Sequence, residues 1–160
     1  AESDNPHLKE KETNMIRSLL ILSACVTLVG GRAAELTWLT NLEKAQERAK
    51  TDKKVVLINF TGSDWCGFCK RLDKQVFATQ EFADYAKDNL VLVKADFPRT
   101  TPLPEDLKQA NARIKNRYEV RGFPTLVMID GDGRVLGKKV GYGGDSPTAV
   151  INEFKGWRKK

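Results

Sequence analysis

The chain has 160 residues, 41% of them hydrophobic, which is enough to bury one ordinary core, so we expect a single domain. Its 27 basic and 21 acidic residues give a net charge of +6, yet no basic run is typical of a groove binder, and we expect no nucleic-acid partner. Three cysteines are too few for a small scaffold held together by disulfides, which excludes that class.

The amino-terminal segment is predicted to be a targeting signal and not part of the fold. Residues 1–14 are polar and charged and are interpreted as a disordered extension. Residues 18–29 (SLLILSACVTLV) form an apolar run behind a basic residue and ahead of small residues, too short to span a bilayer. This layout is typical of a signal peptide over residues 15–34, cleaved near Ala34. The domain then covers residues 35–160, and we expect export, most simply to a bacterial periplasm.

Three alternatives stay open for this segment. Cleavage after Ala33 also fits, because it places a glycine instead of an arginine three residues before the cut. Leu22-Ser23-Ala24-Cys25 resembles the lipobox of bacterial lipoproteins, in which the cysteine carries a lipid, so anchoring through Cys25 is a second hypothesis. A buried core helix is the third.

Hydrophobic periodicity predicts the first half of the domain in chain order. A short strand over residues 36–38 precedes a helix over residues 40–50, and residues 54–60 (KVVLINF) are typical of a buried strand. A loop follows, then two cysteines at the start of a second helix. Thr79 caps a further helical turn, and residues 90–95 (LVLVKA) form the next buried strand.

The second half contains a loop, two strands and two helices. Three prolines exclude regular structure from residues 97–104, and a helix is predicted over residues 107–118. Strands over residues 125–129 and 134–140 flank Asp-Gly-Asp-Gly, a hairpin turn that lacks the further oxygen ligands of a calcium loop. The last helix starts at Ser146, ahead of a proline. This order predicts an α/β fold in which helices cover both faces of a mixed sheet.

The two closely spaced cysteines are the strongest sign of chemistry. Cys66 and Cys69 lie three residues apart, with the first at the start of a helix, where backbone N–H groups and the helix dipole favour a thiolate. We therefore expect Cys66 to be the nucleophile that opens a substrate disulfide and Cys69 to be the resolving cysteine that releases the product. A bridge between them closes so short a loop that it would stabilise the fold little.

Other uses of the cysteine pair lack the necessary residues. A structural zinc site needs four ligands, and the domain has no second close pair of cysteines. The single histidine, His7, lies in the polar extension, so Cys66 has no histidine base of the kind a cysteine protease uses. We expect no metal and no cofactor.

Two motifs in the same order resemble the thioredoxin superfamily. These are Trp65-Cys66-Gly67-Phe68-Cys69-Lys70 and Arg121-Gly122-Phe123-Pro124-Thr125, and the similarity spans about residues 39–157. Residues 60–66 and 95–98 look most like exported bacterial disulfide reductases and isomerase-like proteins, the chlamydial periplasmic oxidoreductase among them. The resemblance implies a thioredoxin-like mixed β-sheet flanked by helices on both faces.

The resemblance also implies roles for residues around the cysteines. It implies that Pro124 is cis and lies against the pair, and that Phe123 offers backbone groups to an extended substrate. Trp65, Gly67 and Phe68 would shape the site, although simple packing is an equal alternative for Trp65. These residues complete the candidate site.

Two departures from the family pattern bear on the direction of electron flow. Asn59 stands near the position of thioredoxin's buried aspartate, and Phe68 stands where strong oxidases have a histidine that stabilises the thiolate. We therefore favour a reductase or isomerase-like enzyme, a monomer that acts on disulfides of exported proteins and is re-reduced by a membrane electron donor. The alternative is a peptide-binding module of the same fold in which the disulfide is structural.

Overall fold

The computed structural model describes residues 36–159. The predicted extension, the signal peptide and the alternatives at Cys25 lie outside the described residues. Among the helices that are described, none combines the length and the apolar character needed to cross a membrane.

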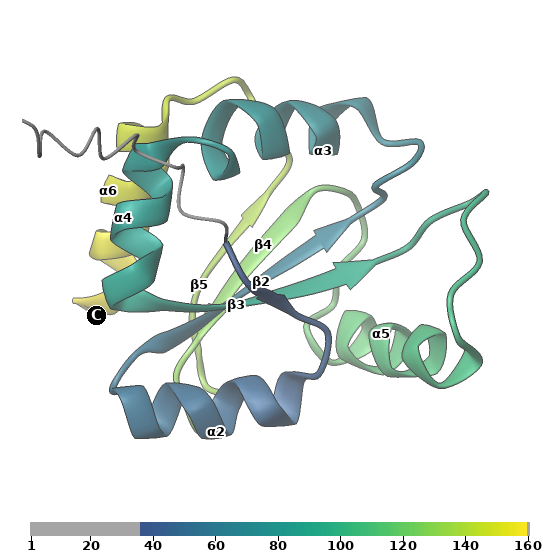
Figure 1. The fold of residues 1–160 in the computed structure, drawn as a ribbon, viewed down its shortest axis with the longest axis horizontal. Coiled ribbons are helices and arrows are strands. Elements are labelled where there is room, and N and C mark those ends of the chain that lie inside the picture. Colours follow the sequence, from purple (N-terminus) through teal and green to yellow (C-terminus); the bar gives the residue numbers. More distant parts are fainter. Residues whose placement is uncertain (1–35, 160) are drawn as a thin grey trace, which may run out of the picture. The chain divides into compact units, whose positions relative to one another are not determined.

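The centre of the domain is a five-stranded sheet with the order β1-β3-β2-β4-β5 (Figure 1). Its strands are β1 (Trp38–Leu39), β2 (Val55–Thr61), β3 (Leu90–Asp96), β4 (Thr125–Ile129) and β5 (Val135–Val140). The first three strands in this order pair in parallel, whereas β4 is antiparallel to both β2 and β5. The predicted mixed sheet is therefore confirmed.

Helices cover both faces of this sheet (Figure 1). They are α2 (Leu42–Asp52), α3 (Gly67–Leu72), the π-helix η1 (Asp73–Phe77), α4 (Gln80–Asn89), α5 (Glu105–Arg117) and α6 (Pro147–Arg158). One core contains residues of α3, η1, α4 and α6, and the other contains residues of α2 and the end of α5. The predicted α/β fold is confirmed.

The two cores are separated by the alternation of side chains along β2. Leu57 belongs to the core under α3, α4 and α6, whereas Val56, Ile58 and Phe60 belong to the core on the opposite face. All four side chains are completely buried. This burial on both faces explains the uninterrupted apolar run in the sequence and holds the end of β2 rigidly below the cysteines.

Some boundaries of helices and strands differ from the sequence prediction. The helix after the cysteines changes from α-helix to π-helix at Asp73 and ends before Thr79, whose hydroxyl caps α4 as predicted. Helix α5 starts at Glu105, two residues early, because Pro104 takes the cap position without a side-chain hydrogen bond. Strand β5 starts at Val135, because the Asp130 carboxylate accepts the Arg134 N–H in the turn.

We predict that Gly137→Ala destabilises the domain. Gly137 lies in β5 beneath the ring of Trp157 in α6, and a Cβ there would overlap the indole. Overpacking of this kind costs about 1–3 kcal/mol. Chemical denaturation should show this loss, whereas Gly143→Ala, where a Cβ meets no atom, should change the free energy of unfolding by less than about 0.5 kcal/mol. Equal stability of the two variants would contradict the packing of α6 on β5.

Candidate active site

The two cysteines lie where the chain leaves β2 and enters α3. The turn from β2 to α3 is closed by the Gly62 carbonyl, which accepts the N–H of Trp65 at 3.3 Å and that of Cys66 at 2.9 Å. Cys66 has an extended backbone and is the N-cap of α3, and its Sγ accepts the Cys69 N–H at 3.2 Å. The first sulfur therefore accepts an N–H group that has no partner within the helix, which is the arrangement that favours a thiolate.

Cys66 and Cys69 are joined by a disulfide, with their Cα atoms 5.2 Å apart. Cys66 has 6% of its surface exposed and Cys69 has 1%. The pair is thus asymmetric, because the sulfur at the cap is the more accessible one and the second lies on the buried side of the helix. A CXXC disulfide of this kind can exchange electrons with a thiol pair that approaches from the Cys66 side.

Aromatic side chains from three segments form a wall beside Cys66. Trp65 meets Phe123 edge to face at a centroid distance of 5.9 Å, and Phe123 stacks on Phe97 at 5.1 Å. The Trp65 indole N–H donates to the Phe97 carbonyl at 2.8 Å, and its ring lies over Gly62, where a Cβ would collide with it. The structure therefore brings Trp65 and Phe123 together.

The remaining site residues occupy distinct places. Pro124 follows a cis peptide bond, is buried and directly precedes β4, the strand next to β2. Its carbonyl accepts the Gly141 N–H at 2.8 Å, which ties it to the end of β5. Gly67 and Phe68 lie exposed in the first turn of α3, with Phe68 53% exposed, and they do not join the aromatic wall.

Asp64 holds the proline-rich loop of residues 97–104 against the site. Its carboxylate accepts the backbone N–H groups of Arg99, Thr100 and Thr101 at 2.7–3.1 Å, and the Thr100 hydroxyl at 2.6 Å. These donors hold the pKa of Asp64 well below its ordinary value. Sequence reasoning missed this role, because an aspartate in a turn ordinarily bonds to its own neighbours and not to a loop about 35 residues away.

A group of polar side chains lies on the sheet face that carries α3. Asn59 on β2 and Lys94 on β3 are register partners, and the buried Asn59 Oδ1 has no hydrogen-bond partner within residues 36–159. Asp73 follows Cys69 by four residues, and its N–H donates to the Cys69 carbonyl. Burial raises the pKa of Asp73, the Lys94 ammonium opposes this rise, and the Asp96 carboxylate adds to it.

Asp73 is therefore a half-buried carboxyl group one helical turn after the second cysteine. It was missed in the sequence, although its i+4 spacing from Cys69 is the signal that could have identified it. Asn59, the nearest counterpart of thioredoxin's buried aspartate in the sequence, is a buried and neutral residue of β2.

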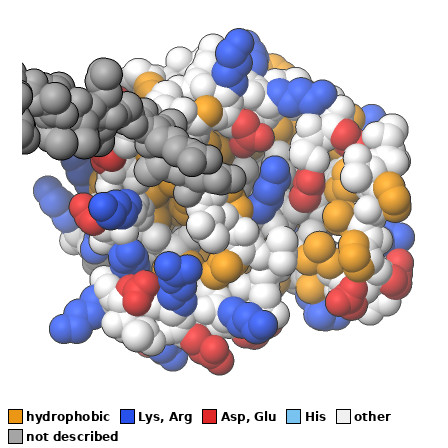
Figure 2. All heavy atoms as spheres, in the orientation of Figure 1, with side chains coloured by type: hydrophobic (Ala, Val, Ile, Leu, Met, Phe, Trp, Pro, Cys, Tyr) orange, Lys and Arg blue, Asp and Glu red, His pale blue; other side chains and the backbone are white. Residues whose placement is uncertain are grey.

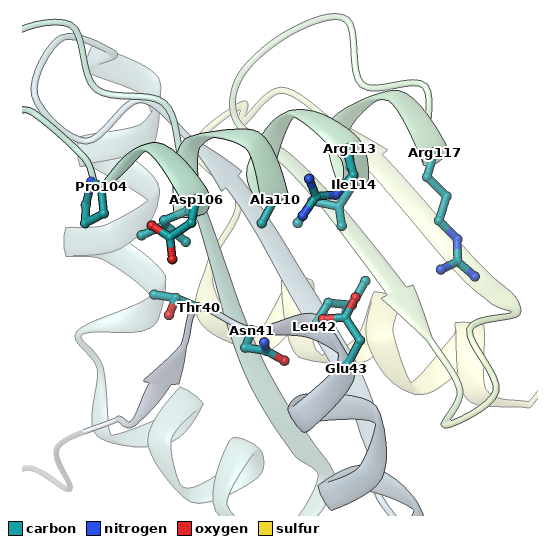
Figure 3. Close-up of a pocket in the computed structure, with 11 residues that line it drawn as sticks. Thr40, Asn41, Leu42, Glu43, Pro104, Asp106, Ala110, Arg113, Ile114 and Arg117 are labelled. Carbon is teal, nitrogen blue, oxygen red and sulfur yellow. The ribbon is translucent and has the colours of Figure 1, made fainter.

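The described surface also contains a hollow far from the cysteines in the fold. It has a volume of about 600 Å³ and lies between the start of α2 and one side of α5 (Figure 3). Side chains of both charges line it, among them Glu43, Asp106, Arg113 and Arg117. Neither Cys66 nor Cys69 contributes to it, and no cluster of three metal-ligating side chains occurs within residues 36–159.

The fold and the CXXC disulfide together define a thioredoxin-like thiol-disulfide oxidoreductase. The family model of the thioredoxin-like domain matches residues 42–152, and the chain belongs to this family.

The relatives agree with this class. The chain is 37% identical over 123 residues to the disulfide bond reductase DsbH of Chlamydia pneumoniae, covering 77% of this chain and 73% of the relative. A solved DsbH oxidoreductase matches with a TM-score of 0.73 and 36% identity over 79% of this chain and 87% of that one. A thioredoxin from Thermus thermophilus, at 18% identity, a TM-score of 0.56 and coverage of 76% and 85%, shares the fold.

We predict that Asp73→Asn removes a pH-dependent cost in stability. Because the pKa of Asp73 is raised in the folded state, the folded protein binds a proton more tightly than the unfolded chain does. The cost is absent below the unfolded value of about 3.9 and develops as the pH rises through the raised folded value. The free energy of unfolding of the variant should therefore exceed that of the parent at pH values above the raised folded pKa. Below the unfolded pKa this difference should disappear.

Chemical denaturation between about pH 3 and pH 7 measures the difference. Asp84→Asn, an exposed change on α4, is the matched control. A variant that is less stable than the parent at neutral pH would show that the attraction of Lys94 outweighs the burial of Asp73.

Proposed function

We propose that the chain is an exported disulfide reductase whose electrons pass through Cys66 and Cys69. One observation carries the proposal: the more accessible sulfur caps α3, and the less accessible sulfur is bonded to it from one turn further on. This arrangement provides an attacking and a resolving cysteine. Isomerase-like action is the variant of the same chemistry in which the resolving step is delayed.

The reaction begins from the dithiol form. The Cys66 thiolate attacks a substrate disulfide, a new sulfur–sulfur bond forms, and the first substrate sulfur leaves as a thiolate that takes up a proton. Cys69 then loses its proton and attacks the Cys66 sulfur, which releases the second substrate thiol. Two electrons have passed to the substrate, and the enzyme is left with the Cys66–Cys69 disulfide.

Asp73 supports the second step as an acceptor for the Cys69 proton. Its carboxyl group follows Cys69 by one helical turn, and burial keeps its pKa above the ordinary range, which brings it closer to that of a thiol. Asn59 cannot take up a proton at neutral pH. Asp73 thus supplies from the helix the carboxylate that Asn59 does not provide.

The direction follows from what surrounds Cys66. A strongly oxidising pair needs a very stable thiolate, and here Phe68 takes the place between the cysteines where strong oxidases have a histidine. The name of the 37% identical relative, a disulfide bond reductase, supports the same direction. The proposed substrates are exported proteins with disulfides, and the proposed electron source is a membrane carrier that reduces the Cys66–Cys69 bond.

The substitution Cys69→Ser tests the proposal. In a Cys25→Ser background it should accumulate a mixed disulfide through Cys66 when the reduced protein meets oxidised insulin, because the resolving sulfur is missing. Mass spectrometry before and after reduction identifies the bond. The parent should reduce insulin catalytically with dithiothreitol as electron source.

Cys66→Ser in the same background is the matched control. It keeps one cysteine of the pair, the buried one, and should trap at least about tenfold less insulin because that sulfur is shielded. No adduct with either variant, together with no insulin reduction by the parent, would instead favour a binding module with a structural disulfide.

A further inference from the structure

Two arginines lie over exposed aromatic rings beside the cysteines in the sequence. The Arg99 guanidinium is 3.9 Å from the centre of the Trp65 ring, and Trp65 directly precedes Cys66. The Arg71 guanidinium is 4.6 Å from the centre of the Phe68 ring, and Phe68 lies between the cysteines. The cationic rim is defined here as Arg71 and Arg99 on these two rings.

Arg99 is held in place by the proline-rich loop. Its backbone N–H donates to both oxygens of Asp64, at 3.0 Å each, and the loop hydrogen bonds of Asp64 continue to Thr101. The Asp64 carboxylate bonds to backbone N–H groups of the loop and forms no ion pair with the Arg99 guanidinium. The loop therefore positions a cation at the rim without neutralising it.

Neither arginine of the rim has an acidic partner within residues 36–159. Some cations elsewhere in the domain are paired, for example Lys50 with Asp132 at 2.7 Å and Lys139 with Glu153 at 2.7 Å, and Arg71 and Arg99 belong to those that are not. Lys70 adds a further charge next to the cysteines and donates only to the Asp64 carbonyl. Lys and Arg side chains are visible along the edge of the molecule formed by α3 (Figure 2).

A guanidinium that stacks on a ring still has donors to offer. A cation over the face of a ring keeps N–H groups that the ring does not use, and these can form the fork that matches a carboxylate. Contact with the ring restricts the arginine side chain, so less conformational entropy is lost when an anion binds. Two such cations, one over the residue before Cys66 and one over a residue between Cys66 and Cys69, fit an acidic polypeptide that binds at the pair.

We propose that the cationic rim recognises acidic residues that flank the disulfide of a protein substrate. The inference rests on the proposed function and adds the class of substrate. Arg71 and Arg99 act as specificity-determining residues: they raise the rate at which acidic segments reach Cys66 and do not take part in sulfur exchange. Electrostatic attraction of this kind acts mainly on association and weakens with salt.

The experiment uses peptides with one disulfide flanked by glutamates or, in a matched peptide, by glutamines. The second-order rate constant for oxidation of the reduced full-length protein is measured for each peptide in a single turnover, so that no electron donor is needed. The parent should react about three- to tenfold faster with the glutamate peptide at low ionic strength. This ratio should fall toward one near 1 M salt, where the screening length is about 3 Å.

The double substitution Arg71→Gln and Arg99→Gln should lower the glutamate-to-glutamine ratio by about three- to fivefold. Arg113→Gln combined with Arg117→Gln, which removes the same two charges from α5 on the opposite face of the sheet, should leave the ratio unchanged. An unchanged ratio in the double variant, or no preference in the parent, would overturn this inference and leave the proposed function intact. Failure to reduce either peptide would overturn the proposed function and this inference with it.

Discussion

The capping of α3 by the Cys66 sulfur is the interaction on which the candidate site depends. A cap must have an extended backbone and an acceptor directed at the first N–H groups of its helix, and Cys66 meets both requirements with its sulfur. The same geometry places Cys69 one turn later on the buried side. The geometry that caps α3 therefore also makes Cys66 the more accessible cysteine and Cys69 the more shielded one.

Tertiary structure supports this cap from two sides. Strand β2 is buried on both faces, so its end is rigid, and the Gly62 carbonyl closes the turn to Cys66. On the outer side, Asp64 draws the loop of residues 97–104 against Trp65, and Phe123 completes the wall from the segment before β4. Segments that are far apart in the sequence thus meet around the two cysteines.

Features set by local chemistry could be predicted from the sequence. The caps at Thr79 and Ser146, the bounds of β4 and the start of a helix at the cysteines each depend on a few neighbouring residues. Contacts across the fold could not be predicted in this way. The hydrogen bonds of Asp64 to a distant loop and the stacking of Arg99 on Trp65 require knowledge of how the loop returns to the site. Asp73 combines both kinds of feature. Its spacing from Cys69 can be seen in the sequence, whereas its burial depends on residues that the fold brings against it.

The reduction potential of the Cys66–Cys69 pair is the measurement that tests the account most directly. The neutral Asn59 and the apolar Phe68 leave the thiolate without a buried charge to stabilise it, and the arginines of the rim face solvent, which screens them. Equilibration of the full-length protein with a glutathione or dithiothreitol buffer should give a value close to that of thioredoxin, about −270 mV. A value near −120 mV, typical of a strong oxidant, would contradict the proposed direction of electron flow.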